Sequence, residues 1–420
     1  MGHPNKRHMM CALLGGIAVI AQPTCARAAP SDGSLAPRAD IAGARPQPEY
    51  DPLGLRIGTL VASPELHVGT GYDSNLFGLD SDVKSDGYTI FTPSLRIGSD
   101  WGLHGVSLSA HSTLTRYFRY PIQNTNEYEI QGAGKLDFDS TKIAAGVSLS
   151  RSAERRGANG TPLSLGAPSL YRNISESFHV QQDLGAIGLG AAVSHQDNSY
   201  SDITLLSGAT LNQSFRDSEE WEVNVHAAYS RSPDASIGVT GLYKHARAKT
   251  PPSHTNDTLS FGGTFALDAG MFRVEAEGTY LRRNFSNPIF RDFGGFIYNG
   301  TLTWYPTTLL TVSLHGAGSL DNSGVPTVGT IIARSYRLNA DYELLRNVVL
   351  NAQISRGRQS FPEVGGKAEA HAQSLSGEYK VNRTVAIGAY GRHECKSSSV
   401  RLTAKHYCVA LAGLTLTFKH

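Results

Sequence analysis

Long apolar runs are missing from the body of this chain. Of its 420 residues, 18% are charged and 9% are aromatic, and the mean hydropathy is −0.24. A membrane-spanning helix needs about 20 consecutive apolar residues, and no such stretch follows the N-terminal segment. A helical membrane protein is therefore excluded.

Neither sign of charge dominates. The chain has 38 Lys and Arg against 36 Asp and Glu. Domains that bind nucleic acid usually carry a clustered basic excess, so we expect no nucleic-acid partner.

Catalytic and metal-binding motifs are also scarce. The chain has four cysteines and fifteen scattered histidines, and it contains no HExxH, GxSxG or P-loop pattern. The two cysteines beyond the N-terminal segment lack zinc-site spacing. We predict no enzyme, metal site or cofactor; a Ser/His/Asp cluster assembled in space is the remaining catalytic alternative.

The N-terminus resembles a targeting signal. A basic region at residues 6–8 precedes an apolar segment at 9–21 and a small-x-small cleavage site at 26–28. This arrangement predicts a secretory signal peptide over residues 1–28. Residues 29–50 are rich in Pro, Ala and Arg without periodicity, which predicts a flexible periplasmic extension.

Alternation is what the rest of the chain has in abundance. In residues 221–229 one face reads Trp, Val, Val, Ala, Tyr and the other Glu, Asn, His, Ala, and residues 187–194, 272–280 and 296–304 repeat the split. A period of two is typical of strands. The polar faces carry charges, which a wet lumen accepts and a dry core does not. The apolar faces often begin or end on aromatics, as at membrane interfaces.

Eight short turns rich in Gly, Pro, Asn and Asp separate the strands, and longer polar loops lie between them. The pattern predicts an all-β, antiparallel transmembrane β-barrel over residues 51–420, with about 18 strands or alternatively 16, short periplasmic turns and longer extracellular loops. The turns are expected near residues 99–102, 139–140, 183–185, 232–234, 268–270, 306–307, 345–347 and 381–383.

Parity along the strands assigns several charges to the inner face. A barrel of this width holds an aqueous lumen, and a charged constriction or simple solvation of the lumen would both explain them. The candidate lumen charges are Arg119, Glu127, Glu129, Glu222, Glu275, Glu277, Arg337 and Asp341.

Cys395 and Cys408 flank the last long loop. Counted from Val385 and Phe418, they stand at similar heights on the outward faces of neighbouring strands. In an oxidising compartment this predicts a disulfide, with two unpaired thiols as the alternative.

The start of the barrel carries a recognisable motif. Residues 50–58 read Tyr-Asp-Pro-Leu-Gly-Leu-Arg-Ile-Gly, and residues 72–77 read Tyr-Asp-Ser-Asn-Leu-Phe. These segments resemble the beta-barrel porin-2 family of Gram-negative outer-membrane proteins, whose motif positions correspond here to Tyr72, Asp73, Asn75 and Phe77. The resemblance would cover about residue 50 to the end, and it implies presumed transport activity and a link to exopolysaccharide production. The chain departs from the usual aromatic ending of barrels, because Lys419 and His420 follow Phe418.

These observations predict an outer-membrane pore or conduit for hydrophilic solutes, with a link to exopolysaccharide export implied by the resemblance. The alternative is a structural or docking barrel that anchors an envelope assembly, motivated by the proline-containing residues 29–50. The expected partners are outer-membrane lipid, the barrel assembly machinery and polysaccharide export components.

Overall fold

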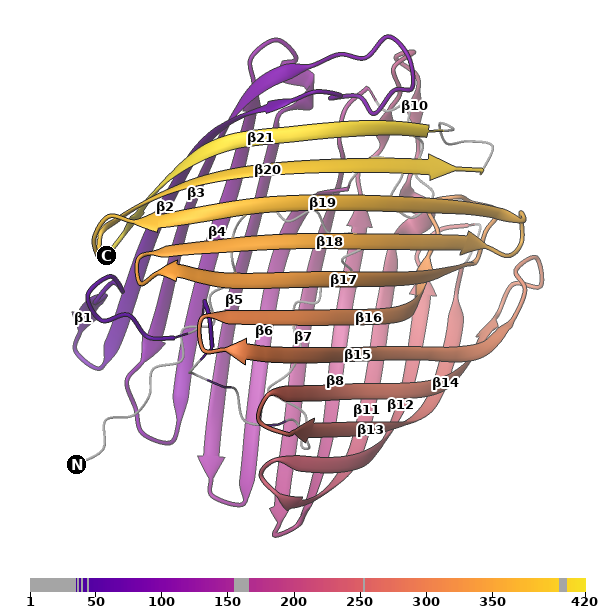
Figure 1. Cartoon of the computed structure of the whole chain (residues 1–420). Helices are drawn as coiled ribbons and strands as arrows, with labels where there is room; N and C mark the ends of the chain where they lie inside the picture. The colour runs from indigo at the N-terminus through magenta and orange to yellow at the C-terminus, as the bar shows by residue number, and fades with distance from the viewer. Residues whose placement is uncertain are drawn as a thin grey trace.

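In the computed structural model the chain forms a closed antiparallel β-barrel (Figure 1). The structure describes Leu35, Arg38 and residues 41–43, 45–154, 166–251, 254–399 and 406–420, so the expected signal peptide lies outside the described residues. Over these ranges eighteen long strands pair in sequence, and the last pairs with the first. The prediction of an eighteen-stranded barrel is confirmed.

The barrel strands contain 13 to 16 residues each. Within the described residues no helix is long and apolar enough to cross a membrane. The barrel strands are β2 (Leu60–Asp73), β3 (Asp86–Ser99), β4 (Gly105–Tyr117), β5 (Thr125–Phe138), β6 (Thr141–Glu154), β7 (Ser169–Leu184), β8 (Ile187–Tyr200), β11 (Ser218–Ser232), β12 (Ala235–Ala248), β13 (Asn256–Asp268), β14 (Phe272–Phe285), β15 (Phe293–Thr307), β16 (Leu310–Asn322), β17 (Thr330–Leu345), β18 (Val348–Phe361), β19 (Gly366–Lys380), β20 (Val385–Ser398) and β21 (His406–Lys419). The smaller elements are β1 (Leu55–Ile57), β9 (Ile203–Thr204), β10 (Thr210–Leu211) and the 3-10 turns η1 (Pro121–Gln123) and η3 (Ser214–Arg216).

Side-chain exposure is inverted relative to a soluble protein. The outward-facing Phe261 and Leu414 are 67% and 62% exposed, whereas the inward-facing Thr279 and Thr417 are 5% and 4% exposed. Burying apolar surface away from water is the main driving force of folding, so this outward band needs lipid around it. The alternation in the sequence is therefore the alternation between lipid and lumen.

Each of the eight expected short turns joins neighbouring strands at the same end of the barrel. Three of them use left-handed backbone, at Asp139 (φ 58°), Gly185 (φ 75°) and Gly270 (φ 77°), where Asp and Gly are tolerated. The opposite end carries the longer loops, apart from the four-residue turn 362–365 between β18 and β19. The C-terminus lies at the short-turn end, which is the periplasmic end (Figure 1).

Residues 55–62 form a small hairpin at the periplasmic end of the barrel. Strand β1 folds back onto the start of β2, with Leu55 paired to Ala62. Pro64 lies within β2, one residue before pairing with β21 begins at Glu65. Here β2 has a barrel partner on one side only, which is where a strand tolerates proline.

The described residues of the N-terminal extension contact the periplasmic rim. The Leu35 carbonyl accepts a hydrogen bond from the Arg273 side chain (2.8 Å), and the Pro48 carbonyl accepts a hydrogen bond from the Arg383 side chain (2.9 Å). Between them, Arg45 forms an ion pair with the buried Glu343 (2.7 Å). These contacts follow the rim from β14 past β17 to the β19–β20 turn. Flexibility of residues 29–50 as a whole stays a prediction.

Candidate functional site

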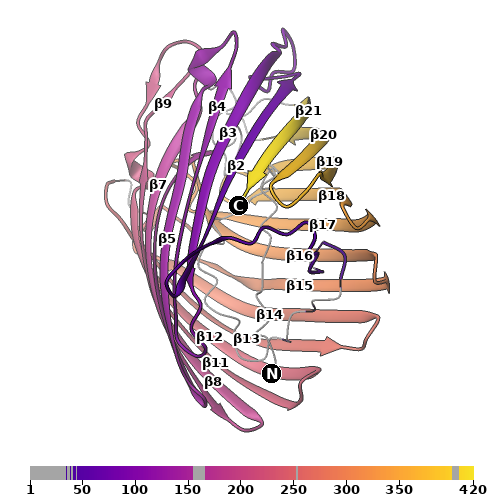
Figure 2. The same cartoon turned by 90° about the vertical axis from the view of Figure 1, so that its left-hand side faces the viewer.

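The lumen is the candidate functional site, and its walls differ in charge. Strands β2–β8 form one wall and β14–β21 the facing wall (Figure 2). Counted round the ring, β17 lies ten strands from β5 in one direction and eight in the other, so the two are nearly opposite. Charges that share a height on opposite walls would set up a field across the pore.

Acidic side chains outnumber basic ones on the inner faces from β5 to β14, where Lys135, Lys244 and Arg283 also face inward. Glu127 accepts a hydrogen bond from the Ala153 amide (3.0 Å), and Glu129 lies 3.7 Å from His111. Further round, Glu222 pairs in register with Lys244. We call Glu127, Glu129, Glu222 and Glu277 the acidic arc.

Three basic side chains, Arg337, Arg392 and Lys396, face the lumen on β17 and β20, where they alternate with the acidic Asp341, Glu343 and Glu394. Arg337 is exposed to the lumen. Arg392 and Lys396 lie 2.9 and 3.3 Å from the shared carboxylate of Glu394. We call Arg337, Arg392 and Lys396 the basic arc. Only Arg337 of this set is among the predicted lumen charges, although Arg392 and Lys396 also alternate with the outward positions that follow Val385.

The other candidate lumen charges are placed as follows. Glu275 lies 2.8 Å from Arg273 near the periplasmic rim, and Asp341 accepts hydrogen bonds from Asn339 and Asn351, both at 2.7 Å. Arg119 lies in the β4–β5 loop, where its amide donates to Asp86 (2.9 Å). Their role in permeation stays a prediction.

The wall is split between β15 and β16 in its extracellular half. Pairing of these strands starts at Thr307 and Leu310 and stops at Asn299 and Ala317. Beyond that point β15 continues against β14 up to Phe293, and β16 continues against β17. The β16–β17 hairpin therefore departs from the circular wall.

The end of this hairpin, residues 323–329, turns into the mouth, and we call it the mouth tip. Just before the mouth tip, the side-chain amide of Asn322 donates a hydrogen bond to the Glu220 carboxylate on β11 (3.2 Å). Strand β11 lies five strands away from β16 round the wall. Within the mouth tip, the Pro326 carbonyl accepts from Nε2 of His254 (3.2 Å). Because Glu220 belongs to the inward face of β11, the contact places the tip over the lumen.

An apolar cluster holds the mouth tip from the other side. Val325, Val328, Ile331 and Phe361 are at most 5% exposed and pack together. The amide of Gly329 also donates to Glu363 in the β18–β19 turn (3.3 Å). The mouth tip thus spans from β11 to β18.

Ionisable groups of the neighbouring loops are packed against this mouth structure. Burial lowers the pKa of His254, so its imidazole is neutral at pH 7 and Nε2–H donates to Pro326. In η3, burial opposes the charge of Arg216, but the Glu154 carboxylate outweighs it and raises the pKa. The two are joined by hydrogen bonds of 2.7 and 2.6 Å. The loop between β8 and β11 is thereby fixed to the end of β6.

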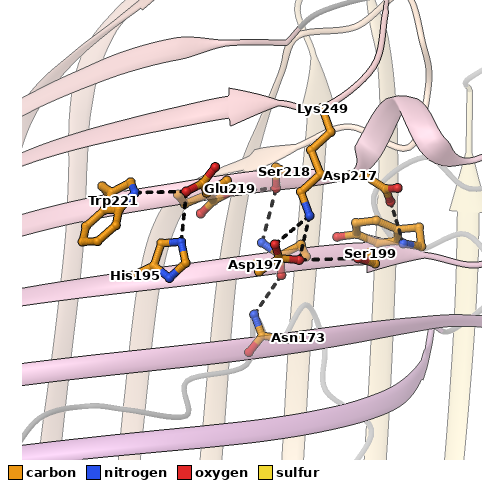
Figure 3. Close-up of polar contacts among 12 residues, drawn as sticks. Asn173, His195, Asp197, Ser199, Asp217, Ser218, Glu219, Trp221 and Lys249 are labelled. Carbon is orange, nitrogen blue, oxygen red and sulfur yellow. Dashed lines mark hydrogen bonds and ion pairs between the residues drawn. The ribbon is translucent and has the colours of Figure 1, made fainter.

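A network of polar side chains joins β8 and β11 near their extracellular ends (Figure 3). Lys249 donates to both oxygens of Asp197 (2.8 and 2.7 Å). His195 lies 3.3 Å from Glu219, which also accepts from the Trp221 indole (3.4 Å). Trp at the edge of the apolar band is typical of the lipid headgroup level.

The family motif lies at the closing seam, where β2 meets β21. The Asn75 side chain donates to the Cys408 carbonyl (3.0 Å) and the Leu79 carbonyl (2.8 Å) and accepts from the Leu79 amide (3.0 Å). The Asp73 carboxylate accepts from the Asn75 amide (2.8 Å), and Phe77 packs edge-on against Tyr120 at 5.3 Å. These contacts tie the first extracellular loop to the last strand. Tyr72 is an outward residue, 52% exposed.

Two tyrosines reinforce the seam from inside. Gly71 and Gly413 are directly paired, and the hydroxyls of Tyr88 and Tyr390 meet across them at 2.6 Å. A Cβ atom on Gly71 would lie 2.7 Å from Tyr88, and one on Gly413 would lie 2.5 Å from Tyr390. Glycine is therefore required at both positions.

The two cysteines face outward beside the same seam. Cys395 and Cys408 are directly paired across β20 and β21 and are joined in a disulfide. Their outward parity follows that of Val385 and Phe418, as the counting from the sequence assumed.

A closed barrel with an apolar outer band, a polar charged interior and short turns at one end is the architecture of outer-membrane β-barrel proteins. The family model "Putative beta-barrel porin 2" matches residues 47–419. The chain belongs to this family, and its place is the bacterial outer membrane.

Solved structures with a similar architecture include three from Pseudomonas aeruginosa. OccK1 (OpdK) is 13% identical, with a TM-score of 0.44 over 86% of this chain and 98% of that one. OpdK with vanillate is 14% identical, with a TM-score of 0.44 over 86% and 98%. OccK2 (OpdF) with glucuronate is 10% identical, with a TM-score of 0.46 over 85% and 98%. A comparison with curated proteins gave no match.

Proposed function

We propose that this protein is a passive outer-membrane pore for small hydrophilic solutes. The observation that carries the proposal is a closed lumen lined by charged side chains, with an excess of acids from β5 to β14 and acids and bases mixed on β17 and β20. These charges favour polar or zwitterionic solutes that can align with them. Solutes would then cross the pore by diffusion, and the charges of the two arcs would orient them.

The mouth tip refines this proposal. It lies across the extracellular opening and is anchored on both sides by Asn322 and by the cluster around Phe361. We infer that a tip in this position narrows the entrance of the lumen. This arrangement favours small solutes over a bulky chain.

Passage of an exopolysaccharide chain is the second candidate, and the family resemblance is its support. It requires that the mouth tip swing out to admit a polymer. Measuring exopolysaccharide secretion by a strain that lacks the protein would test this candidate. Unchanged secretion would contradict a role in polymer export.

Recordings in planar bilayers under a salt gradient test the proposed pore. We expect Glu129→Gln with Glu222→Gln to shift selectivity toward anions, and Arg337→Gln to shift it toward cations. One charge acting at 4 Å in water is worth about 1 kcal/mol, or up to about fivefold in local ion concentration. Shifts of the same sign in both variants would contradict the two-arc account, and absence of any conductance would contradict a pore.

A further inference from the structure

The outward face of the last hairpin carries four metal-ligating side chains in one group. His393 and Cys395 lie two residues apart on β20, and His406 and Cys408 lie two residues apart on β21. Residues two apart on a strand share a face, and the two cysteines are directly paired. The sequence His-x-Cys therefore occurs on both arms of one hairpin, with each histidine beside its own cysteine.

Three of these ligands, His393, Cys395 and Cys408, lie close enough together for a common ion, and His406 stands beside Cys408. Nε2 of His393 lies 3.8 Å from Sγ of Cys395, and Nε2 of His406 lies 3.6 Å from Sγ of Cys408. His393 and both cysteines present ligand atoms within 4.8 Å of one another. Two thiolates and two imidazoles are the ligand set of tetrahedral Zn²⁺ sites.

We propose that Cys395, Cys408, His393 and His406 form a redox-gated site for a thiophilic cation such as Zn²⁺. In the oxidised state the disulfide withholds both sulfurs, because only a thiolate is a strong ligand. Reduction by a low-molecular-weight thiol breaks the S–S bond and forms two protein thiols, while two reductant molecules join in their own disulfide. Metal binding then releases the two thiol protons.

The barrel holds these ligands together without the disulfide. Pairing of β20 and β21 extends on both sides of the cysteines, from Ser397 and His406 down to Val385 and Phe418. The Cys408 carbonyl is also held by Asn75. Reduction therefore leaves the two thiols side by side instead of releasing them.

The position is open to water. On β20 the outward residues from Val385 to Gly391 are apolar or small, and His393 begins the polar section above them. Both histidines are exposed and both cysteines are half-buried. The site thus stands above the lipid band at the extracellular rim, where an external cation can reach it.

Cobalt spectroscopy on the purified full-length barrel tests the proposal. After reduction with a phosphine, and with both thiols verified by titration, Co²⁺ should give thiolate charge-transfer absorption and the visible bands of a tetrahedral site. Zn²⁺ should bleach both. The oxidised barrel should show neither signal.

Variants separate this site from adventitious binding. His393→Ala with His406→Ala keeps both thiols and should weaken Co²⁺ binding by at least about tenfold, since even outer-shell partners of a metal site are worth that much. The control is His245→Ala, which removes a half-buried histidine of β12 and should leave binding unchanged. Heat-shifted gel migration confirms that each variant is a folded barrel.

Three outcomes would overturn the proposal. The first is the absence of charge-transfer absorption in the reduced wild type, which needs no variant at all. The second is full Co²⁺ affinity in the double histidine variant, which would mean that the two thiols bind the ion without the histidines. The third is full Co²⁺ affinity in the Cys395→Ser, Cys408→Ser double variant, which would mean that the imidazoles bind the ion without either sulfur.

Discussion

Two strand boundaries of this barrel are built in opposite ways. At the closing seam, β2 and β21 pair only up to Asp73 and Leu411, yet the wall continues because Ser74 and Asn75 bond the backbone of β21 above that point. At the split, β15 and β16 also stop pairing part-way up, and no loop among the described residues continues their pairing. There the free hairpin turns inward and becomes the mouth tip.

The difference shows that two incompletely paired strand boundaries can serve different ends in one barrel. One closes the wall, and the other releases the hairpin that forms the mouth tip. Unpaired strand edges are costly within a membrane, so the closing seam is reinforced by the motif and by a tyrosine pair, and the disulfide joins β21 to β20 beside it. The split lies toward the extracellular end, where water can solvate free backbone groups. Only at that height is a hairpin free to leave the wall.

The largest expected effect comes from filling the seam. Gly413→Val would drive a side chain into Tyr390 and into the Thr70 carbonyl, which a Cβ would approach to 2.6 Å. We expect a loss of at least about 1–3 kcal/mol in the free energy of unfolding, measured as the urea midpoint of heat-shifted migration. The control is Gly98→Val, an inward position where a Cβ meets nothing within 4 Å. Equal effects at the two glycines would contradict the seam account.

Removing the motif amide comes next. Asn75→Ala deletes the bonds to Leu79 and Cys408 and leaves backbone groups unpaired, which costs about 1–3 kcal/mol. The same unfolding assay measures the loss. Asn287→Ala is the matched control, because Asn287 caps an exposed turn at the β14–β15 loop (3.1 Å to the Ile289 amide). A variant as stable as wild type would show that the motif is not what closes the seam.

A smaller effect is expected at the split. Asn322→Ala removes one hydrogen bond to Glu220, which retains its 2.5 Å contact with Lys244, and costs about 0.5–1.5 kcal/mol. Hydrogen exchange of residues 318–332 should then be about two- to tenfold faster. Asn351→Ala, a lumen residue near the periplasmic end, should leave that segment unchanged. If exchange in both variants matched wild type, Asn322 would not anchor the tip.

The smallest effect concerns pH. Because burial lowers the pKa of His254 in the docked state, a proton binds better when the tip is undocked. Docking is therefore unaffected above about pH 6.5 and weakens as the pH falls below it. The rings of Phe215 and Phe290 and the guanidinium of Arg216 face this imidazole.

Hydrogen exchange of the mouth tip at about pH 7.5 and about pH 5.5, corrected for intrinsic rates, measures this shift. His254→Gln should flatten the pH dependence while keeping a donor for Pro326. A tip that loosens equally in the glutamine variant would assign the effect to another group.

Much of this barrel could be predicted from the sequence because its signals are local. Alternation and turn residues gave eighteen strands, and counting from Phe418 placed Cys408 opposite Cys395. The split could not be predicted in this way, because residues 293–298 and 318–322 keep their strand character after their mutual pairing ends. Periodicity reports which face a side chain takes, but it does not report which neighbour the strand keeps.

The candidate site shows the same limit. Parity found the acidic residues Glu129 and Glu222 and also the basic Arg337, and it extends without change to Arg392 and Lys396. The grouping into two arcs needed the closed ring, which sets β17 nearly opposite β5. The metal-ligand group was missed because zinc spacing was sought along the chain, whereas the two halves of this group lie on paired strands.

Single-channel recording of wild type beside a variant lacking residues 324–327 tests the central claim most directly. If the mouth tip narrows an open, charged lumen, wild type conducts and the shortened variant conducts more at every voltage, with its ion selectivity unchanged because both arcs remain. Equal conductance in the two proteins would show that the tip does not narrow the pore, and absence of conductance in both would contradict the pore itself.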